Sequence, residues 1–199
     1  KNLFNCPAVF LYDFKQFVCL RARINDKTML SLIIDIEKVT KMLISQIEDK
    51  RLKICAVLIT HNHKKHVSGL KTLRKIYNFK TYAADYEIEG EESMILKGDG
   101  LIRLAGMNIN YFSLPGHSSD SIIYKIGGTL FTGDALSNGM IGKTTSIYAR
   151  QMLIRNLNEK VMSQSDNTAL LPGHGPPTTV GAERKYNQDL NPKAELNMK

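Results

Sequence analysis

The sequence lacks any long hydrophobic run. No apolar stretch approaches the roughly 20 residues that a membrane-spanning helix needs. There is also no evident signal peptide, because the start of the chain is short and is broken by Pro7. We therefore predict that membranes are not a partner of this protein.

Cysteine is scarce, and its placement excludes the common paired-cysteine motifs. The three cysteines, Cys6, Cys19 and Cys55, are scattered and form no C-x-x-C pair. Cys19 and Cys55 lie in apolar runs that are typical of strands, so we predict that they are buried free thiols. Unpaired thiols suit a reducing compartment, and the predicted localisation is cytoplasmic.

Acidic residues are the minority among the charged residues. The chain has 19 Asp and Glu against 27 Lys and Arg, which gives a net charge of +8. The lysines are spread along the chain, and no basic block interleaved with aromatic residues appears, so we predict no nucleic-acid partner. Two interpretations stay open: a solvated, lysine-rich surface, and attraction of a small anionic substrate. The oligomeric state is not indicated.

The length and the hydrophobic pattern predict an α/β protein. With 199 residues, of which 43% are hydrophobic, the chain can form one good core, and we predict a single domain over 1–199 with a tail at 192–199. The pattern predicts strands at 8–12, 17–22, 29–34, 54–59, 79–83, 93–97, 101–104, 107–114, 122–126, 129–131 and 168–171, helices at 38–49, 67–77, 146–163 and 179–189, and an exposed loop at 85–92.

Three histidines stand together after a predicted strand. His61, His63 and His66 fall directly behind the apolar run 54–59 and in front of the predicted helix 67–77. A turn from a strand end into a helix can aim several imidazoles at one point, and imidazole is a common zinc and iron ligand. A single histidine is more often structural, but this spacing favours a metal site.

The remaining histidines and one aspartate repeat this placement. His117 and His174 each follow a Pro-Gly pair at the end of an apolar run, and Asp134 ends Thr-Gly-Asp after a further run. An aspartate in such a turn is often only a turn residue. Its position behind a strand, like that of the histidines, favours a ligand. The chain has five histidines, and all of them fit this pattern.

The order of these motifs resembles the metallo-β-lactamase superfamily. That order is His-x-His-x-x-His, Pro-Gly-His, Thr-Gly-Asp and Pro-Gly-His-Gly, and the resemblance runs from about Asp35 to about Pro192. Within the superfamily, segments 131–136, 139–143 and 173–184 look like the glyoxalase II (hydroxyacylglutathione hydrolase) branch. The resemblance implies an αββα sandwich, in which two mixed β-sheets lie face to face with helices on the outer faces.

The resemblance also implies a ligand set. His61, His63 and His117 would hold a first metal, Asp134 would bridge two metals, and His66 and His174 would belong to the second. Imidazole and carboxylate ligands of this kind suit Zn²⁺, and Fe²⁺ or Mn²⁺ as alternatives. Asp134 is thus both a metal ligand and a catalytic candidate.

Lys65 departs from the family pattern, which has an aspartate ligand of the second metal there. Lysine is a poor metal ligand at neutral pH and repels a second cation, so we predict one metal rather than two. Three hypotheses remain for Lys65. It pairs with Asp134 and replaces the second metal's charge, or it turns outwards, or it marks a site that has lost catalysis.

The predicted function is metal-dependent hydrolysis of a small anionic thioester by a metal-activated water, with Lys65 and Asp134 as catalytic residues. Lys143, in a glycine-rich loop, is a candidate for binding a substrate carboxylate, or is an ordinary surface lysine. Alternatives are a persulfide dioxygenase-like enzyme with one iron on His61, His117 and Asp134, and a catalytically degenerate metal-binding module. Nucleic-acid-processing members carry extra domains that find no room in 199 residues.

Overall fold

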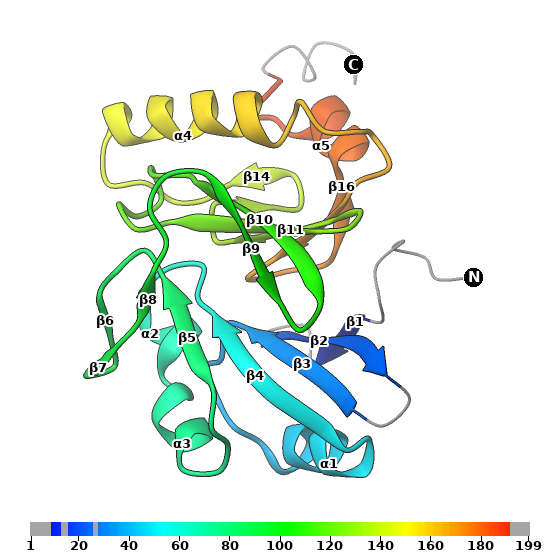
Figure 1. Ribbon diagram of the computed structural model, residues 1–199. Coiled ribbons are helices and arrows are strands. Elements are labelled where there is room, and N and C mark those ends of the chain that lie inside the picture. The colour runs from blue at the N-terminus through cyan, green and yellow to red at the C-terminus, as the bar shows by residue number, and fades with distance from the viewer. Residues whose placement is uncertain (1–8, 13–15, 26–27, 192–199) are drawn as a thin grey trace.

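The computed structural model describes residues 9–12, 16–25 and 28–191, and it has two β-sheets face to face between two layers of helices (Figure 1). Each of these sheets has six strands. The first contains, in order, β1 (Val9–Tyr12), β2 (Gln16–Asn25), β3 (Thr28–Ile34), β4 (Leu52–Leu58), β5 (Lys80–Ala83) and β8 (Met94–Ile95). The second contains, in order, β16 (Thr178–Thr179), β15 (Ala169–Pro172), β12 (Thr129–Gly133), β11 (Ile122–Ile126), β10 (Met107–Ser113) and β9 (Gly100–Leu104).

Helices cover the outer face of each sheet. α1 (Lys41–Asp49), α2 (Lys64–Val67) and α3 (Leu70–Arg74) belong to the first layer, and α4 (Ile147–Lys160) and α5 (Val180–Tyr186) to the second (Figure 1). Two small hairpins lie beside the sheets, β6 (Glu87–Ile88) with β7 (Glu91–Glu92), and β13 (Leu136–Ser137) with β14 (Met140–Ile141). This is the αββα sandwich that the motif order predicted.

Both sheets are mixed. The pairs β3–β4, β4–β5, β5–β8 and β12–β15 are parallel, and β2–β3, β10–β11 and β11–β12 are antiparallel. Parallel neighbours end at the same edge of a sheet, and loops at that edge are the usual place for a site in α/β proteins. The carboxyl ends of β3, β4, β12 and β15 therefore bring Asp35, the His61 turn, Asp134 and His174 towards one edge.

The core has three parts. One cluster fills the space between the sheets and includes Leu32, Leu58, Tyr124 and Phe131, while two others lie between each sheet and its helices. Strand β4 is buried on both faces, which explains why it reads as a nearly continuous apolar run. The buried Tyr124 hydroxyl donates to the Ile59 carbonyl (2.7 Å), which ties the second sheet to the chain just before the histidine turn.

The predicted helix 67–77 is confirmed only in part, because α3 covers 70–74 and Val67 belongs to the separate short helix α2. Gly69 lies between them and its N–H donates to the Ile36 carbonyl (2.9 Å). A Cβ at this position would lie 2.7 Å from the Ile36 side chain, so only glycine allows this close approach. The tertiary contact with residue 36 therefore overrides the continuous helical pattern.

Other boundaries also differ from the predictions. The segment 85–92 contains the hairpin β6–β7 rather than only a loop, and the strand at 93–97 is reduced to β8. Helix α1 begins at Lys41, not at residue 38, because the Thr40 side chain caps it by accepting from the Leu43 N–H (3.2 Å). The predicted tail at 192–199 lies outside the described residues.

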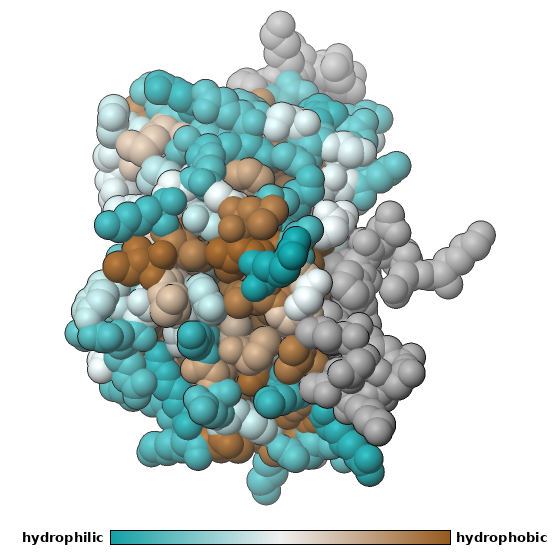
Figure 2. All heavy atoms as spheres, in the orientation of Figure 1, coloured by the Kyte–Doolittle hydropathy of each residue, from teal (hydrophilic) through white to brown (hydrophobic). Residues whose placement is uncertain are grey.

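Several large hydrophobic side chains are exposed on the surface. Figure 2 shows a band of hydrophobic residues across the middle of this face, and exposed Met94, Ile95 and Leu101 lie on the edge strands β8 and β9. Over the residues described, none of the helices is both long and apolar enough to cross a bilayer.

Cys55 is a free, partly buried thiol that donates to the Ser31 carbonyl (3.3 Å), and the side chains of Cys6 and Cys19 fall outside the described part.

Candidate metal centre

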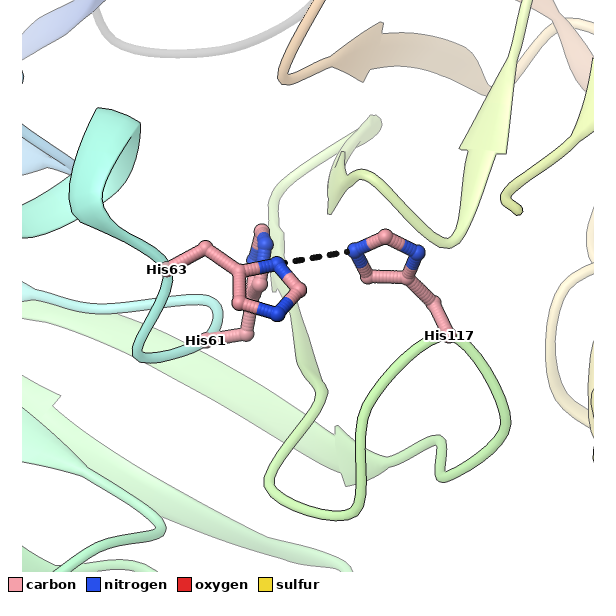
Figure 3. Close-up of side chains that lie close together, drawn as sticks. All are labelled: His61, His63 and His117. Carbon is pink, nitrogen blue, oxygen red and sulfur yellow. Dashed lines mark hydrogen bonds between the residues drawn. The ribbon is translucent and has the colours of Figure 1, made fainter. Parts of the chain in front are cut away.

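The structure brings all the ligand residues predicted from the sequence to one edge of the sandwich. Three of them, His61, His63 and His117, form what we call the nitrogen cluster (Figure 3). His61 and His63 come from the turn between β4 and α2, and His117 comes from the loop between β10 and β11. Their ligand nitrogens lie within 4.8 Å of one another, and His117 Nε2 is 3.1 Å from His63 Nδ1.

The other three, His66, Asp134 and His174, form the carboxylate cluster. His174 Nδ1 lies 2.7 Å from Asp134 Oδ1, and His66 Nε2 lies 3.3 Å from the same oxygen. The two clusters touch, because His61 Nε2 is 4.0 Å from Asp134 Oδ2. His61, His66 and Asp134 themselves form a second group whose ligand atoms lie within 4.8 Å of one another.

The carboxylate of Asp35 helps to hold one histidine of each cluster in place, His66 directly and His61 through Thr60. Its carboxylate accepts from the Thr60 N–H (2.8 Å) and the Thr60 hydroxyl (2.7 Å), and it lies 2.8 Å from His66 Nδ1. The Thr60 hydroxyl is in turn 3.1 Å from His61 Nδ1. Bonds of this kind fix each imidazole with Nε2 directed at the metal position. The resemblance to the metallo-β-lactamase superfamily implies a supporting role of this kind for Asp35, whereas nothing in the sequence pointed to Thr60.

The backbone of Asp35 has an unusual conformation. Asp35 has φ of 55°, a left-handed conformation that residues other than glycine rarely adopt. Aspartate tolerates it better than most residues, and its N–H donates to the Leu58 carbonyl (2.9 Å). The family that the sequence resembles usually has Asp-Pro-Gly here, whereas this chain has Asp35-Ile36-Glu37. The turn still keeps a buried carboxylate, 3% exposed, under the histidines.

Two buried nitrogens are left without a hydrogen-bond partner within the described part of the chain, His61 Nε2 and His66 Nε2. Buried polar atoms are nearly always paired, and an orphan needs an explanation such as a missing ion. Both atoms belong to the group that also contains Asp134, and both rings are held by their Nδ1 atoms. The residues present therefore fit a divalent metal ion.

The pKa values of the two buried imidazoles, His61 and His66, are shifted in opposite directions. Burial lowers the pKa of His61 to about 3, so this ring is neutral at physiological pH. Burial also pulls the pKa of His66 down, but the negative charges of Asp35 and Asp134 outweigh it and raise that pKa to about 10. Burial pushes the pKa of Asp134 up, yet its interactions with His66 and then His174 hold it well below the usual range.

Close packing at the site requires glycine at two places. A Cβ on Gly173 would lie 2.5 Å from Asp134 Oδ1 and 2.7 Å from His66 Cε1. A Cβ on Gly142 would collide with the Asp134 carbonyl oxygen. The glycines of these two segments therefore let the backbone approach the carboxylate cluster directly.

A cavity of about 400 Å³ opens over the two clusters. It is lined by Lys65, His117, Asp134, Ser137, Met140, Ile141, Gly142, Lys143 and His174. The sequence predicted Lys65 and Lys143 as site residues, and both line this cavity with their side chains exposed. Sequence reasoning missed Ser137, Met140 and Ile141, which share only their glycine-rich loop with the predicted residues.

Lys65 does not neutralise Asp134 in this structure. The ion pairs of Asp134 are with His61, His66 and His174, and no other described residue pairs with it. The hypothesis that Lys65 takes the place of a metal by pairing with Asp134 is therefore wrong for this conformation. The Oδ1 atom of Asp134 instead lies against the rings of His66 and His174.

Comparisons with known proteins place the whole chain, rather than the individual site residues, in a family. No family model matches the chain. The sequence is 30% identical over 168 residues to the "Probable metallo-hydrolase YqgX" of Bacillus subtilis, covering 73% of this chain and 80% of that protein. This chain belongs to the metallo-β-lactamase superfamily.

Other members of the superfamily are similar over comparable lengths. The hydroxyacylglutathione hydrolase GloC of Haemophilus influenzae is 28% identical over 189 residues, which cover 81% of this chain and 88% of that enzyme. Among solved structures, the B3 metallo-β-lactamase BLEG-1 superposes with a TM-score of 0.79 at 22% identity, covering 92% of this chain and 99% of that one. The predicted resemblance and the predicted fold are thus confirmed.

Proposed function

We propose that this protein is a metal-dependent hydrolase that acts on a small anionic thioester. The observation that carries the proposal is the pair of buried Nε2 atoms of His61 and His66, which accept or donate no hydrogen bond in the described part of the chain and lie beside Asp134 under an open cavity. A metal bound there supplies a water of lowered pKa and a Lewis acid for the acyl carbonyl. Those two actions are the main requirements of thioester hydrolysis.

One metal, held by the nitrogen cluster and Asp134, suits the site better than two. Three imidazoles and one carboxylate are a common set for Zn²⁺, and Fe²⁺ or Mn²⁺ also accept it. Lys65 lines the cavity on the side where a second metal's carboxylate would be expected. Its positive charge disfavours a second divalent cation beside it.

The cavity lining supports the choice of substrate. Lys65 and Lys143 offer two positive charges, and Met140 and Ile141 offer an apolar surface, so an anionic group and an acyl chain can both be accommodated. The similarity to a hydroxyacylglutathione hydrolase supports a thioester in particular. The net charge of +8 would steer such a substrate towards the site, and the steering weakens as salt rises.

The test is a substrate panel with the zinc-, manganese- and iron-loaded protein: S-lactoylglutathione, a short acyl-coenzyme A, a β-lactam and glutathione persulfide. We expect thioester turnover that falls with salt, and a kcat/KM about tenfold lower in Lys143→Ala. Lys41→Ala, which removes the same charge from the distant helix α1, is the matched control and should behave as the wild type.

Three other outcomes would contradict the proposal, each in a different way. Oxygen consumption with the persulfide alone would indicate a persulfide dioxygenase-like iron enzyme. Turnover of the β-lactam alone would indicate a lactamase. No turnover of any substrate by a protein with bound metal would indicate a catalytically degenerate metal-binding module.

A further inference from the structure

The hairpin loop, residues 137–143, forms one wall of the cavity. It contributes Ser137, Met140, Ile141, Gly142 and Lys143 to the lining. Its two strands, β13 and β14, make a two-stranded sheet of their own. Because an isolated two-stranded hairpin is marginally stable in water, contacts from elsewhere in the chain must hold this wall in place.

Glu183 on helix α5 holds the tip of the hairpin loop. The Gly139 N–H donates to both carboxylate oxygens of Glu183, at 3.2 Å and 3.0 Å. The same carboxylate accepts from the Thr178 hydroxyl (2.7 Å) and the Asn187 side-chain amide (2.7 Å). Glu183 is only 2% exposed, and a buried carboxylate is costly unless its oxygens accept hydrogen bonds in this way.

Asp189 holds the middle of the hairpin loop and depends on the same helix end. One of its oxygens accepts from the Ile141 N–H (3.0 Å), and the other pairs with Arg150 on α4 (2.6 Å). The Asn187 side chain accepts from the Asp189 N–H (3.1 Å) and is itself bonded to Glu183. Glu183 therefore supports the loop directly at Gly139 and indirectly through Asn187 and Asp189.

The other end of the hairpin loop is attached to the metal centre. The Gly142 N–H donates to the Ala135 carbonyl (2.9 Å), and the Lys143 carbonyl lies 2.8 Å from His117 Nδ1. The loop is thus fixed at residues 142–143 by the metal-site backbone, and at residues 139–141 by the carboxylates of α5 and the turn after it. Loss of the hydrogen bonds from Glu183 and Asp189 would therefore let Met140 move while the histidines stay in place.

We propose that Glu183 is a positioning residue for substrate binding, which fixes the hairpin loop so that Met140, Ile141 and Lys143 form a preorganised wall of the cavity. The identity of the substrate rests on the proposed function, but the attachment of the loop does not. A carboxylate suits this role because it only accepts, and hydrogen bonds to a charged acceptor are roughly twice as strong as neutral ones. Glutamine has the same shape but presents N–H groups to donors.

The experiment compares Glu183→Gln with Arg184→Gln in the metal-loaded protein. Arg184 is the next residue on α5, and it bonds to Asp166 and to the carbonyls of Met162 and Gln164, away from the hairpin loop. Amide hydrogen exchange of residues 139–143 measures attachment of the loop, and steady-state kinetics with the thioester measure KM and kcat. Asp189→Asn, at a half-buried position, replaces Glu183→Gln if that variant does not fold.

In Glu183→Gln we expect exchange of the Gly139 and Ile141 amides to rise about tenfold, and KM to rise about tenfold with kcat within about twofold of wild type. The d–d absorption of the cobalt-loaded protein should not change, because the histidines stay in place. Arg184→Gln should lower the melting temperature without changing exchange of the loop or KM.

Unchanged exchange of the loop in a folded Glu183→Gln would overturn this inference, and so would equal changes in Arg184→Gln. A substrate panel without turnover would contradict the proposed function alone, because the exchange measurement needs no substrate. Raised exchange with an unchanged KM would show that the attachment is structural only, and would also reject the positioning role.

Discussion

The nitrogen cluster and the carboxylate cluster are held together in different ways. In the carboxylate cluster, His66 and His174 both lie against Asp134, and these contacts raise the pKa of His66 and lower the pKa of Asp134. In the nitrogen cluster, three rings direct nitrogens at one another, and the His61 ring is neutral with its Nε2 unpartnered. The nitrogen cluster has one internal hydrogen bond, between His117 Nε2 and His63 Nδ1 (3.1 Å), and no carboxylate among its three members, so we expect it to depend on a metal ion more than the carboxylate cluster does.

This difference predicts which cluster controls metal binding. Replacing both His61 and His117 with alanine removes two of the three rings of the nitrogen cluster and leaves the carboxylate cluster intact. We expect bound metal to fall below about a tenth of an equivalent and hydrolysis to fall by at least about 10³-fold. Elemental analysis of the purified protein is the measurement, and full metal content in this variant would contradict the assignment.

A smaller effect is expected from giving the carboxylate cluster a further anionic ligand. Lys65→Asp removes one cation from the cavity and adds a carboxylate near His66 and His174, so metal stoichiometry should rise from one towards two. Lys64→Asp is the matched control, because Lys64 is the neighbouring residue on α2 and does not line the cavity. Isothermal titration with Zn²⁺ or Mn²⁺ gives the stoichiometry. Equal values for Lys65→Asp and wild type would mean that charge at residue 65 does not limit the second site.

The smallest expected effect concerns the metal-free protein at alkaline pH. The pKa of His66 is raised to about 10 in the folded chain, so its stabilising contribution is complete below its unfolded pKa of about 6.5 and is lost as pH rises through 10. We expect the melting temperature of the chelator-treated protein to fall by roughly 5 °C between pH 7 and pH 10 from this cause.

Asp35→Asn tests the origin of that alkaline loss. The charge of Asp35 is the largest influence that raises the pKa of His66, so the variant should be less stable at pH 7 and should lose less stability between pH 7 and pH 10. Asp85→Asn, which removes a carboxylate bonded to the exposed Asn62 side chain, should keep the wild-type pH profile. The idea fails if Asp35→Asn and wild type have parallel profiles.

Much of the site could be predicted from the sequence because its signals are local. His61, His63 and His66 stand within one turn, and His117, Asp134 and His174 each follow a strand end marked by glycine. The order of these motifs was enough to predict the superfamily and the αββα fold. Such signals can be recognised in a sequence because residues that are close together in the chain are also close together in space.

Longer-range contacts decided what the local pattern left open. The carboxylate of Asp35 reaches His66 across 31 residues, and Glu183 reaches Gly139 across 44. The contact of Gly69 with Ile36 lies between α2 and α3, so the helix predicted to begin at residue 67 begins only at Leu70. Lys65 lines the cavity without pairing with Asp134, whose Oδ1 lies against His66 and His174. Local sequence patterns were enough to predict the candidate metal ligands. Tertiary packing set which of their nitrogen and oxygen atoms make hydrogen bonds or ion pairs and which stay available to a metal ion. The reason is that burial and hydrogen-bond partners come from segments that are distant in the chain.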